Sequence, residues 1–290
     1  MKSTAMRNRL CIVILAGLIP APAAAQSSAP SSAQAPAVTT QPAAGQSDPD
    51  LLVDVLQPDF NLAALPTTLR VPAGKWAFRV THRFTRNLGD GDFGDAASSL
   101  FGLDGGSQAG LEVRWGVRPG TQVGIHRTSD RSIQLFAQQN ILNERSGGPL
   151  GLDAIATFEG EDNLSERYKT ALGLVASKAV GGQATLYAQP LGVLNSNPFE
   201  VGDVHTLMIG LGGRFRLRRT MYLLAEYTPR VAGYTPFADQ ITFGFESRAG
   251  GHLFQINVGN GFATTLGQLA GGGVEYDQWF LGFNLSRKFF

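Results

Sequence analysis

Cysteine is almost absent from this chain. The single cysteine among 290 residues, Cys11, lies in the apolar run of an N-terminal leader. A mature chain without thiols forms no disulfide and offers no thiolate as a metal ligand or nucleophile. The scarcity excludes disulfide-stapled folds and cysteine-based catalysis, and it suits passage through the periplasm in an unfolded state.

Long apolar runs and an excess of charge are also missing. Behind the leader, no stretch approaches the roughly 18 apolar residues of a membrane helix. The formal net charge of +1 argues against nucleic acid as a partner. No phosphate loop, metal cluster or cofactor motif is present, so we expect no cofactor. With 43% apolar residues and 36 glycines, the chain fits a soluble β-protein or a membrane β-barrel.

The N-terminus predicts a signal peptide over residues 1–25. It has a basic start, a short apolar run and a small-residue cleavage site: Lys2, Arg7 and Arg9, then Leu10 to Leu18, then Ala23-Ala24-Ala25. We expect cleavage near Ala25. Residues 26–72 begin with Ser, Ala, Pro and Gln, which predicts a disordered periplasmic linker. The linker contains a short amphipathic piece, Leu51 to Leu56, and then Phe60-Asn61-Leu62, interpreted as a brief helix or a strap at the mouth of a barrel.

From Gly74 onward the hydrophobic pattern has a period of two. In the last stretch, Leu281, Phe283 and Leu285 fall on one face, and Asn284 and Ser286 fall on the other. About twelve such stretches occur, each near the length of a tilted transmembrane strand. The backbone N–H and C=O groups at a strand edge in lipid have no water to form hydrogen bonds with, so the sheet must close. The pattern predicts an all-β fold over residues 73–290: a closed antiparallel transmembrane β-barrel of about 12 strands.

The connections between these stretches alternate between short and long. Short ones lie near Pro119, 143–148, 178–182, 218–220 and 249–251, and long ones at 87–107, 160–166, 195–203, 229–239 and 259–277. The link around Asp130 is the exception. Short periplasmic turns and longer extracellular loops are typical of porin-like barrels in the outer membrane of Gram-negative bacteria. Aromatic residues near strand ends predict an interfacial girdle: Trp76, Trp115, Tyr168, Tyr227 and Trp279.

Several motifs together resemble a bacterial family of membrane-bound β-barrel proteins catalogued as a domain of unknown function. They are Phe60-Asn61-Leu62, Phe78 to Phe84, Leu100 to Gly106, Gly110-Leu111-Glu112, Gly212 to Phe215, Ala225-Glu226-Tyr227, Gly250 to Gln255 and Gly282 to Arg287. The resemblance covers roughly Phe60 to Phe290. It implies a barrel in a bacterial outer membrane and brings no catalytic residues. Expected partners are outer-membrane lipid, lipopolysaccharide and the barrel-assembly machinery, which would recognise the C-terminal strand. Arg287 departs from the apolar residue common near that end.

Charged residues gather on the strand face opposite the apolar one. The candidates for lining a pore are Lys75, Arg79, Arg83, Glu112, Arg114, Asp153, Lys169, Arg214, Arg216, Glu226, Glu246 and Arg248. Mixed charges with a basic excess predict a narrow passive channel for small polar or anionic solutes. The alternative is a salt-bridged interior that conducts nothing, in a barrel with a structural role.

Three other hypotheses remain open. A lipid-modifying enzyme of the acyl hydrolase type would use His126 with Ser129, although their spacing on one strand puts them on opposite faces. A soluble periplasmic barrel would bind an apolar ligand with an apolar interior. In the first long loop, Asp90, Asp92 and Asp95 are spaced closely enough to bind Ca²⁺, but the distal glutamate of a calcium loop is missing. We expect a solvated acidic loop there, no metal and no enzymatic activity.

Overall fold

The computed structural model describes residues 55–199, 202 and 204–290. The predicted signal peptide, its cleavage near Ala25, the linker as far as residue 54 and most of the amphipathic piece lie outside the described residues. None of the helices in the described part of the chain is long and apolar enough to cross a membrane.

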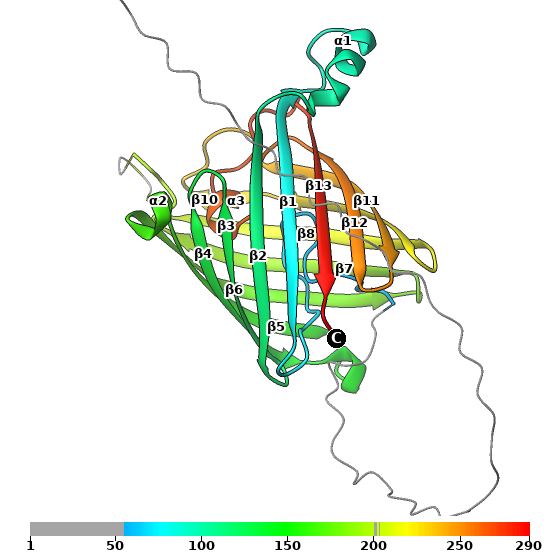
Figure 1. Cartoon of the computed structure of the whole chain (residues 1–290). Coiled ribbons are helices and arrows are strands. Elements are labelled where there is room, and N and C mark those ends of the chain that lie inside the picture. Colours follow the sequence, from blue (N-terminus) through cyan, green and yellow to red (C-terminus); the bar gives the residue numbers. More distant parts are fainter. Residues whose placement is uncertain (1–54, 200–201, 203) are drawn as a thin grey trace, which may run out of the picture. The chain divides into compact units, whose positions relative to one another are not determined.

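Almost all regular structure in the described part is β-strand (Figure 1). The strands are β1 (Trp76–Asn87), β2 (Ser107–Arg118), β3 (Thr121–Thr128), β4 (Ile133–Leu142), β5 (Gly151–Gly160), β6 (Glu166–Val180), β7 (Ala184–Leu194), β8 (Thr206–Arg218), β9 (Met221–Thr228), β10 (Arg230–Gly233), β11 (Gln240–Ala249), β12 (His252–Gly259) and β13 (Phe280–Lys288). The α-helices are α1 (Phe93–Ser98), α2 (Glu161–Leu164) and α3 (Leu266–Leu269), and 3₁₀ turns occupy Leu100–Gly102 and Glu144–Ser146.

The sheet is antiparallel and closes on itself. Consecutive strands pair from β1 to β8, β1 also pairs with β13, and the ladder continues through β12, β11 and β9 back to β8. Both β9 and β10 pair with β8, on either side of Pro229, which has no N–H for the ladder. Together, β9 and β10 therefore occupy the place of a single strand in the wall. The barrel has twelve positions, as predicted, each paired on both sides.

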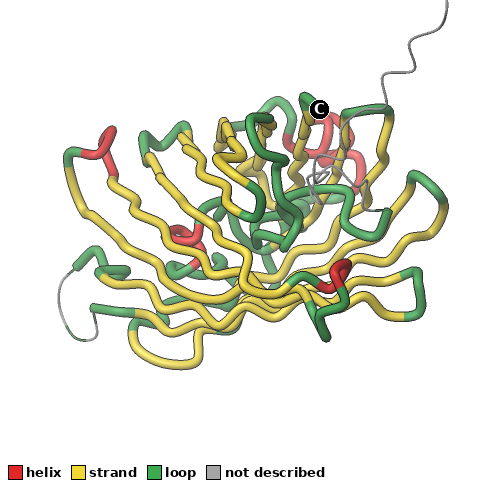
Figure 2. Tube along the Cα trace, turned by 90° about the horizontal axis from the view of Figure 1, so that it is seen from below, coloured by secondary structure: helices red, strands yellow, loops and turns green. Residues whose placement is uncertain are grey.

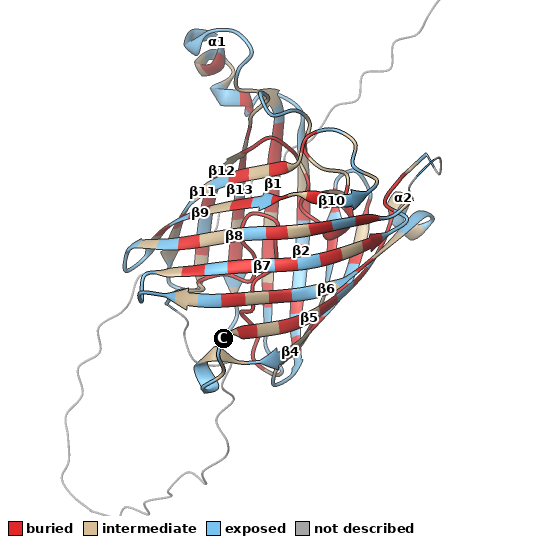
Figure 3. Ribbon diagram, turned by 180° about the vertical axis from the view of Figure 1, so that it is seen from behind, coloured by how far each residue is buried: buried red, intermediate tan, exposed pale blue. Residues whose placement is uncertain are grey.

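Buried and exposed residues alternate along the strands of the wall (Figure 3). Along β9, Tyr222 and Glu226 are buried, whereas Leu223 and Tyr227 are exposed. The exposed face is apolar and the buried face carries arginine, glutamate, glutamine and threonine. A soluble barrel has the opposite arrangement, because its apolar side chains must avoid water. The alternative of a soluble periplasmic barrel is therefore wrong.

Aromatic rings meet near both ends of the strands. At the end with short turns, Trp76 stacks on Phe289 with ring centroids 3.7 Å apart. At the end with long loops, Phe158 stacks on Tyr168 at 5.4 Å. Aromatic residues in membrane barrels favour the zone where the bilayer meets water, so rings near both strand ends agree with the predicted girdle.

The N-terminal residues 55–72 lie inside the barrel (blue in Figure 1, behind β1 and β13). They enter from the short-turn end, reverse direction at Leu62–Leu65 and return to β1. The reversal is a turn in which Leu62 N–H donates to Leu65 O at 2.8 Å and Thr67 N–H donates to Phe60 O at 2.8 Å. We call residues 55–72 the hairpin plug. The prediction of a linker over 26–72 is wrong for this part, since Phe60, Leu62 and Leu65 are 0–3% exposed.

A second segment fills the barrel from the long-loop end. Residues 260–279, between β12 and β13, include α3, and we call them the inner loop. Leu266, Leu269 and Ala270 of this loop share one buried cluster with Leu62 and Leu65 of the plug. Figure 2, a view from below, shows non-strand segments inside the ring of strands. The plug and the inner loop therefore meet within the barrel.

The acidic loop between β1 and β2 forms the small helix α1. Asp92 caps this helix by accepting from Asp95 N–H at 2.9 Å, and Asp95 accepts from Asp92 N–H at 3.1 Å. This reciprocal capping box explains the close spacing of the carboxylates without a metal ion. Among the described residues, no group of three acidic, histidine or cysteine side chains is arranged to hold a metal.

Candidate functional site

The tip of the hairpin plug is bound by one carboxylate of the wall. Oε2 of Glu226, on β9, accepts hydrogen bonds from the backbone N–H groups of Ala63, Ala64 and Leu65 at 3.1, 3.0 and 3.1 Å. Three successive N–H groups of a turn form a concave anion site. Glu226 therefore satisfies donors that the turn leaves without partners within its own backbone.

The opposite side of the same turn faces cationic and amide donors. Ala63 O accepts from Arg79 Nη2 at 2.5 Å, Arg83 Nη2 at 3.2 Å and Asn284 Nδ2 at 3.1 Å. These donors come from β1 and β13, which β12 and β11 separate from β9 in the wall. The turn thus binds a carboxylate through its N–H groups and two guanidinium groups through a carbonyl oxygen, an arrangement that matches the dipole of its peptide groups.

Asn61 connects two buried ion pairs. Its side-chain Oδ1 accepts from Arg114 Nη2 at 2.9 Å, and Arg114 also donates to Glu112 Oε1 at 2.8 Å. Its backbone O accepts from Arg214 Nη2 at 2.8 Å, and Arg214 makes a two-bond pair with Glu246 at 2.7 and 3.0 Å. Buried charges need such partners, because removal from water costs several kcal/mol for each ion.

Inward glycines on β8 make room for the leucines of the plug. A Cβ atom at Gly212 would lie 2.3 Å from Leu62 Cδ1, and one at Gly210 would lie 2.7 Å from Leu65 Cδ2. Both distances are shorter than any van der Waals contact. The two glycines therefore act as recesses in the wall, and a larger residue at either position would push the plug away.

Glutamine and hydroxyl side chains hold the returning strand of the plug. Gln189 Nε2 donates to Pro66 O at 2.7 Å and Gln138 Nε2 donates to Thr67 O at 2.7 Å. Thr68 Oγ1 lies 2.5 Å from Ser177 Oγ on β6. Hydrogen bonds therefore fasten the returning strand of the plug to the wall, in addition to the apolar clusters that contain Leu62, Leu65 and Leu69.

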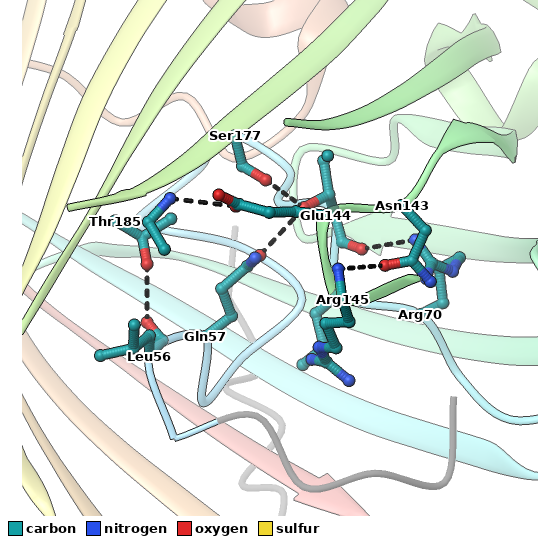
Figure 4. A pocket seen from close by; sticks show the side chains of 12 residues that line it. Leu56, Gln57, Arg70, Asn143, Glu144, Arg145, Ser177 and Thr185 are labelled. Carbon is teal, nitrogen blue, oxygen red and sulfur yellow. Dashed lines mark hydrogen bonds between the residues drawn. The ribbon is translucent and has the colours of Figure 1, made fainter. Parts of the chain in front are cut away.

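A pocket of about 260 Å³ opens beside the plug at the short-turn end (Figure 4). Leu56 and Gln57 of the plug form one side, and Glu144 and Arg145 of the β4–β5 connection form another. Glu144 Oε2 accepts from Ala179 N–H at 3.1 Å, which fixes this connection to β6. The pocket ends at Thr68 and does not extend past the tip of the plug, according to its lining residues.

Deeper in the barrel the space beside the plug is small. A cavity of about 20 Å³ is lined by Asn61 and Pro66 of the plug, His126 and Phe136 of the wall, and Leu266 of the inner loop, among others. A cavity of this size holds about one water molecule. The described arrangement is therefore closed to solutes along this side of the plug.

The structure places most of the predicted pore residues inside the barrel. Those that are buried there are Arg79, Arg83, Glu112, Arg114, Asp153, Arg214, Glu226 and Glu246. Lys169 lies near the long-loop end and pairs with Glu161 at 2.9 Å. Arg216 and Arg248 are half-buried near the short-turn end. Lys75 is exposed and precedes β1. The prediction that it lines the interior is therefore wrong, because the alternation of inward and outward residues begins only with the strand.

The predicted enzymatic pair is not brought together. His126 is buried inside the barrel, with Nδ1 3.8 Å from Glu112 Oε2. Ser129 is exposed after β3, where its Oγ accepts from Ala109 N–H at 3.0 Å. No described contact joins the two side chains, so His126 does not serve as a base for Ser129 in this structure.

The family model described as a membrane bound beta barrel domain (DUF5777) matches residues 59–289. The chain belongs to this family. The match begins within the hairpin plug, so the plug is part of the family's domain along with the wall. The comparison with curated proteins gave no match.

Solved structures similar to this membrane-bound barrel include an outer membrane channel and porins. The channel, from Pseudomonas putida F1, is 12% identical; the alignment covers 82% of this chain and 100% of that one, with a TM-score of 0.48. A triple mutant of the Rhodopseudomonas blastica porin is 13% identical; the alignment covers 67% of this chain and 58% of that one, with a TM-score of 0.33.

Sequence reasoning missed the plug and the inner loop. The inner loop is rich in glycine and resembles an exposed loop, the plug contains three prolines and resembles a linker, and the partners of both are far away in the chain. One signal was available: Gly210 and Gly212 face inward, two residues apart, where polar side chains were otherwise expected. Adjacent recesses on a polar face indicate that another segment packs there.

Proposed function

We propose that the protein is a narrow outer-membrane channel for small polar or anionic solutes, and that the filled interior is its closed state. The observation that carries this proposal is the binding of the plug tip by Glu226 and the arginines. Each of these contacts is a hydrogen bond to a charged group, which exchanges for contacts with water at a net cost of about 1.5–3 kcal/mol. Because water can replace the groups that bind the tip, this attachment favours a segment that leaves and returns.

The preference for anions rests on the arginines that the plug occupies. If the turn leaves, Arg79 and Arg83 lose Ala63 O, and Arg114 and Arg214 lose Asn61. Arg83 has no carboxylate within the salt-bridge distance among the described residues, whereas Arg114 and Arg214 keep Glu112 and Glu246. Uncovered guanidinium groups in a narrow passage favour anions.

The proposal includes the cell location. A signal peptide cleaved near Ala25, export across the inner membrane of a Gram-negative bacterium and insertion by the barrel-assembly machinery would place the short turns in the periplasm. The plug would then enter the barrel from the periplasmic side.

The test is single-channel conductance of the mature protein in a planar bilayer, with a disulfide that fixes the plug. Thr68→Cys/Ser177→Cys is suitable because the two hydroxyl oxygens are 2.5 Å apart, close to the S–S bond length of about 2.05 Å. The only natural cysteine, Cys11, is in the leader. We expect openings with anion preference in the reduced variant and none after oxidation.

Ser177→Cys alone is the control, because its conductance should not depend on the redox state. If the reduced double variant, the control and the unmodified protein insert and stay silent at all voltages, the channel proposal is wrong. The barrel with a structural role would then be favoured, as the small cavity beside the plug already suggests.

A further inference from the structure

The outer face of the wall contains an apolar groove that spans the strands from β7 to β12. Its volume is about 750 Å³, within the range of about 300–1,000 Å³ that ligand sites occupy. The side chains that face it from outside include Leu186, Phe215, Leu223, Phe243, Phe245 and Ile256. All six are exposed, so the groove opens to the surroundings of the barrel and not to its interior.

Two small residues form the floor of the groove. Gly213 on β8 and Ala225 on β9 are paired neighbours, and both face outward by the alternation of their strands. The nearest atom to a Cβ at Gly213 would be Leu186 Cδ2 at 3.5 Å, an ordinary contact. A side chain would thus fit at Gly213, and the hollow between the larger residues is not forced by packing.

The groove lies close to a basic end of the barrel. Leu223 is two residues from the start of β9, which is about 7 Å along a strand. Arg218, the last residue of β8, and Arg219, in the turn that follows, are exposed, and Arg216 and Arg248 lie at the same end. The adjoining turns, residues 181–183 and 250–251, contain only glycine and glutamine, so no carboxylate in them offsets this charge.

We propose that this groove binds an acyl chain of a glycerophospholipid in the leaflet at the short-turn end, with its phosphate held by Arg218 and Arg219. Arginine is the preferred partner of phosphate because its N–H groups match two oxygens. A second copy of the chain in a two-fold arrangement would bring the same arginines together, which disfavours a dimer there. A phospholipid matches both features, since its acyl chain fits the apolar groove and its phosphate pairs with the arginines at the basic end.

The test is native mass spectrometry of the detergent-purified full chain titrated with phosphatidylglycerol. We expect one lipid retained per barrel at low lipid concentration. Gly213→Leu fills the groove, and Arg218→Gln/Arg219→Gln removes the phosphate partners. Each change should weaken retention by about tenfold, since a loss of two buried methylenes or of one charged hydrogen bond has this effect.

Matched controls separate binding from folding. Ala137→Leu changes an outward small residue on β4, and Arg118→Gln removes an exposed arginine in another short turn; both should retain lipid like the unmodified chain. Folding of every variant is checked by its heat-modifiable migration. Equal retention in all folded variants overturns the proposal, and so does a loss that the controls share. The result does not depend on whether the barrel conducts.

Discussion

The Oε2 atom of Glu226 lies 3.0 Å from the backbone nitrogen of Ala64, in the middle of the barrel. The two residues are 162 positions apart in the chain. Their contact joins the side chain of a wall strand to the backbone of the plug, so this charged group helps to position the plug together with the arginines of β1 and the glutamines of the wall. Conservative substitutions of such groups should therefore change the population of the closed state and leave the wall intact.

Replacement of Glu226 by glutamine should release the plug. Glu226→Gln keeps the shape of the side chain but removes the charge that three N–H groups share. A hydrogen bond to a charged group contributes about 1.5–3 kcal/mol, so we expect the released fraction to rise roughly 10- to 150-fold. The measurement is the rate of thiol labelling at Ala64→Cys in the otherwise cysteine-free mature chain, with and without Glu226→Gln.

Glu166→Gln is the matched control, because Glu166 is exposed at the start of β6. Labelling should be as slow in this control as in the parent. Slow labelling in the Glu226→Gln variant would contradict the assigned role of the carboxylate, whatever the conductance experiment shows.

The recess at Gly212 should be sensitive to a single methyl group. Gly212→Ala brings a Cβ to 2.3 Å from Leu62 Cδ1, whereas Gly213→Ala on the outer face meets its nearest atom at 3.5 Å. We expect a loss of stability of about 1–3 kcal/mol for the first change, as for other overpacked sites, and little for the second. The measurement is reversible urea unfolding in lipid vesicles.

A double-mutant cycle assigns the loss at Gly212 to the plug. Leu62→Ala should remove the clash, so Gly212→Ala should cost much less in its presence, giving a coupling of about 1 kcal/mol or more. Additive effects of the two substitutions would show that Gly212 is needed for the wall itself and not for its contact with the plug.

Arg230 holds the long-loop end together. Its guanidinium group pairs with Asp239 at 3.3 Å and donates to Ala238 O at 2.8 Å and to Gly271 O of the inner loop at 3.1 Å. Arg230→Gln should loosen the inner loop. We expect chymotrypsin cleavage after Tyr276, which is exposed, to become about tenfold faster through local opening. Arg118→Gln, at the opposite end, should leave the rate unchanged.

For a wall that spans a bilayer, the free-energy cost of a charged residue on the outer face should depend on its depth in the bilayer. Leu211 lies near the middle of β8 and Leu217 near its end, and both are exposed on the outer face. An arginine at the bilayer midplane of a barrel costs about 2–4 kcal/mol, and one near the interface costs about 0–1 kcal/mol. Leu211→Arg should therefore destabilise the protein in vesicles far more than Leu217→Arg. Equal effects would contradict this position of the bilayer.

The wall was predictable because its signal is local. Residues two apart, such as Leu281 and Phe283, face the same side of a strand, and the lipid outside requires each of them to be apolar. The twelve positions, the short and long connections and the inward charges follow from this alternation. Only Lys75, which lies before the first strand, was placed by extending the pattern too far.

The plug was not predictable from its own residues. Leu62-Ala63-Ala64-Leu65 has no period and lies between proline-containing stretches, as linkers often do. Its burial depends on Glu226, Arg79 and the recesses on β8, which are distant in sequence. Nor do the spacings of the charged residues reveal that their partners are backbone groups of another segment instead of solutes or one another.

The two ends of the described chain meet at the seam between β1 and β13. Asp59, in the plug, accepts from Ser286 Oγ at 2.7 Å, and Lys288 donates to Pro58 O at 2.6 Å. Among the hydrogen bonds of the described residues these two span the greatest sequence separations, 227 and 230 positions, and such distant contacts are slow to form. Both wall partners belong to β13, so the plug completes its contacts only when the strand that closes the barrel is in place.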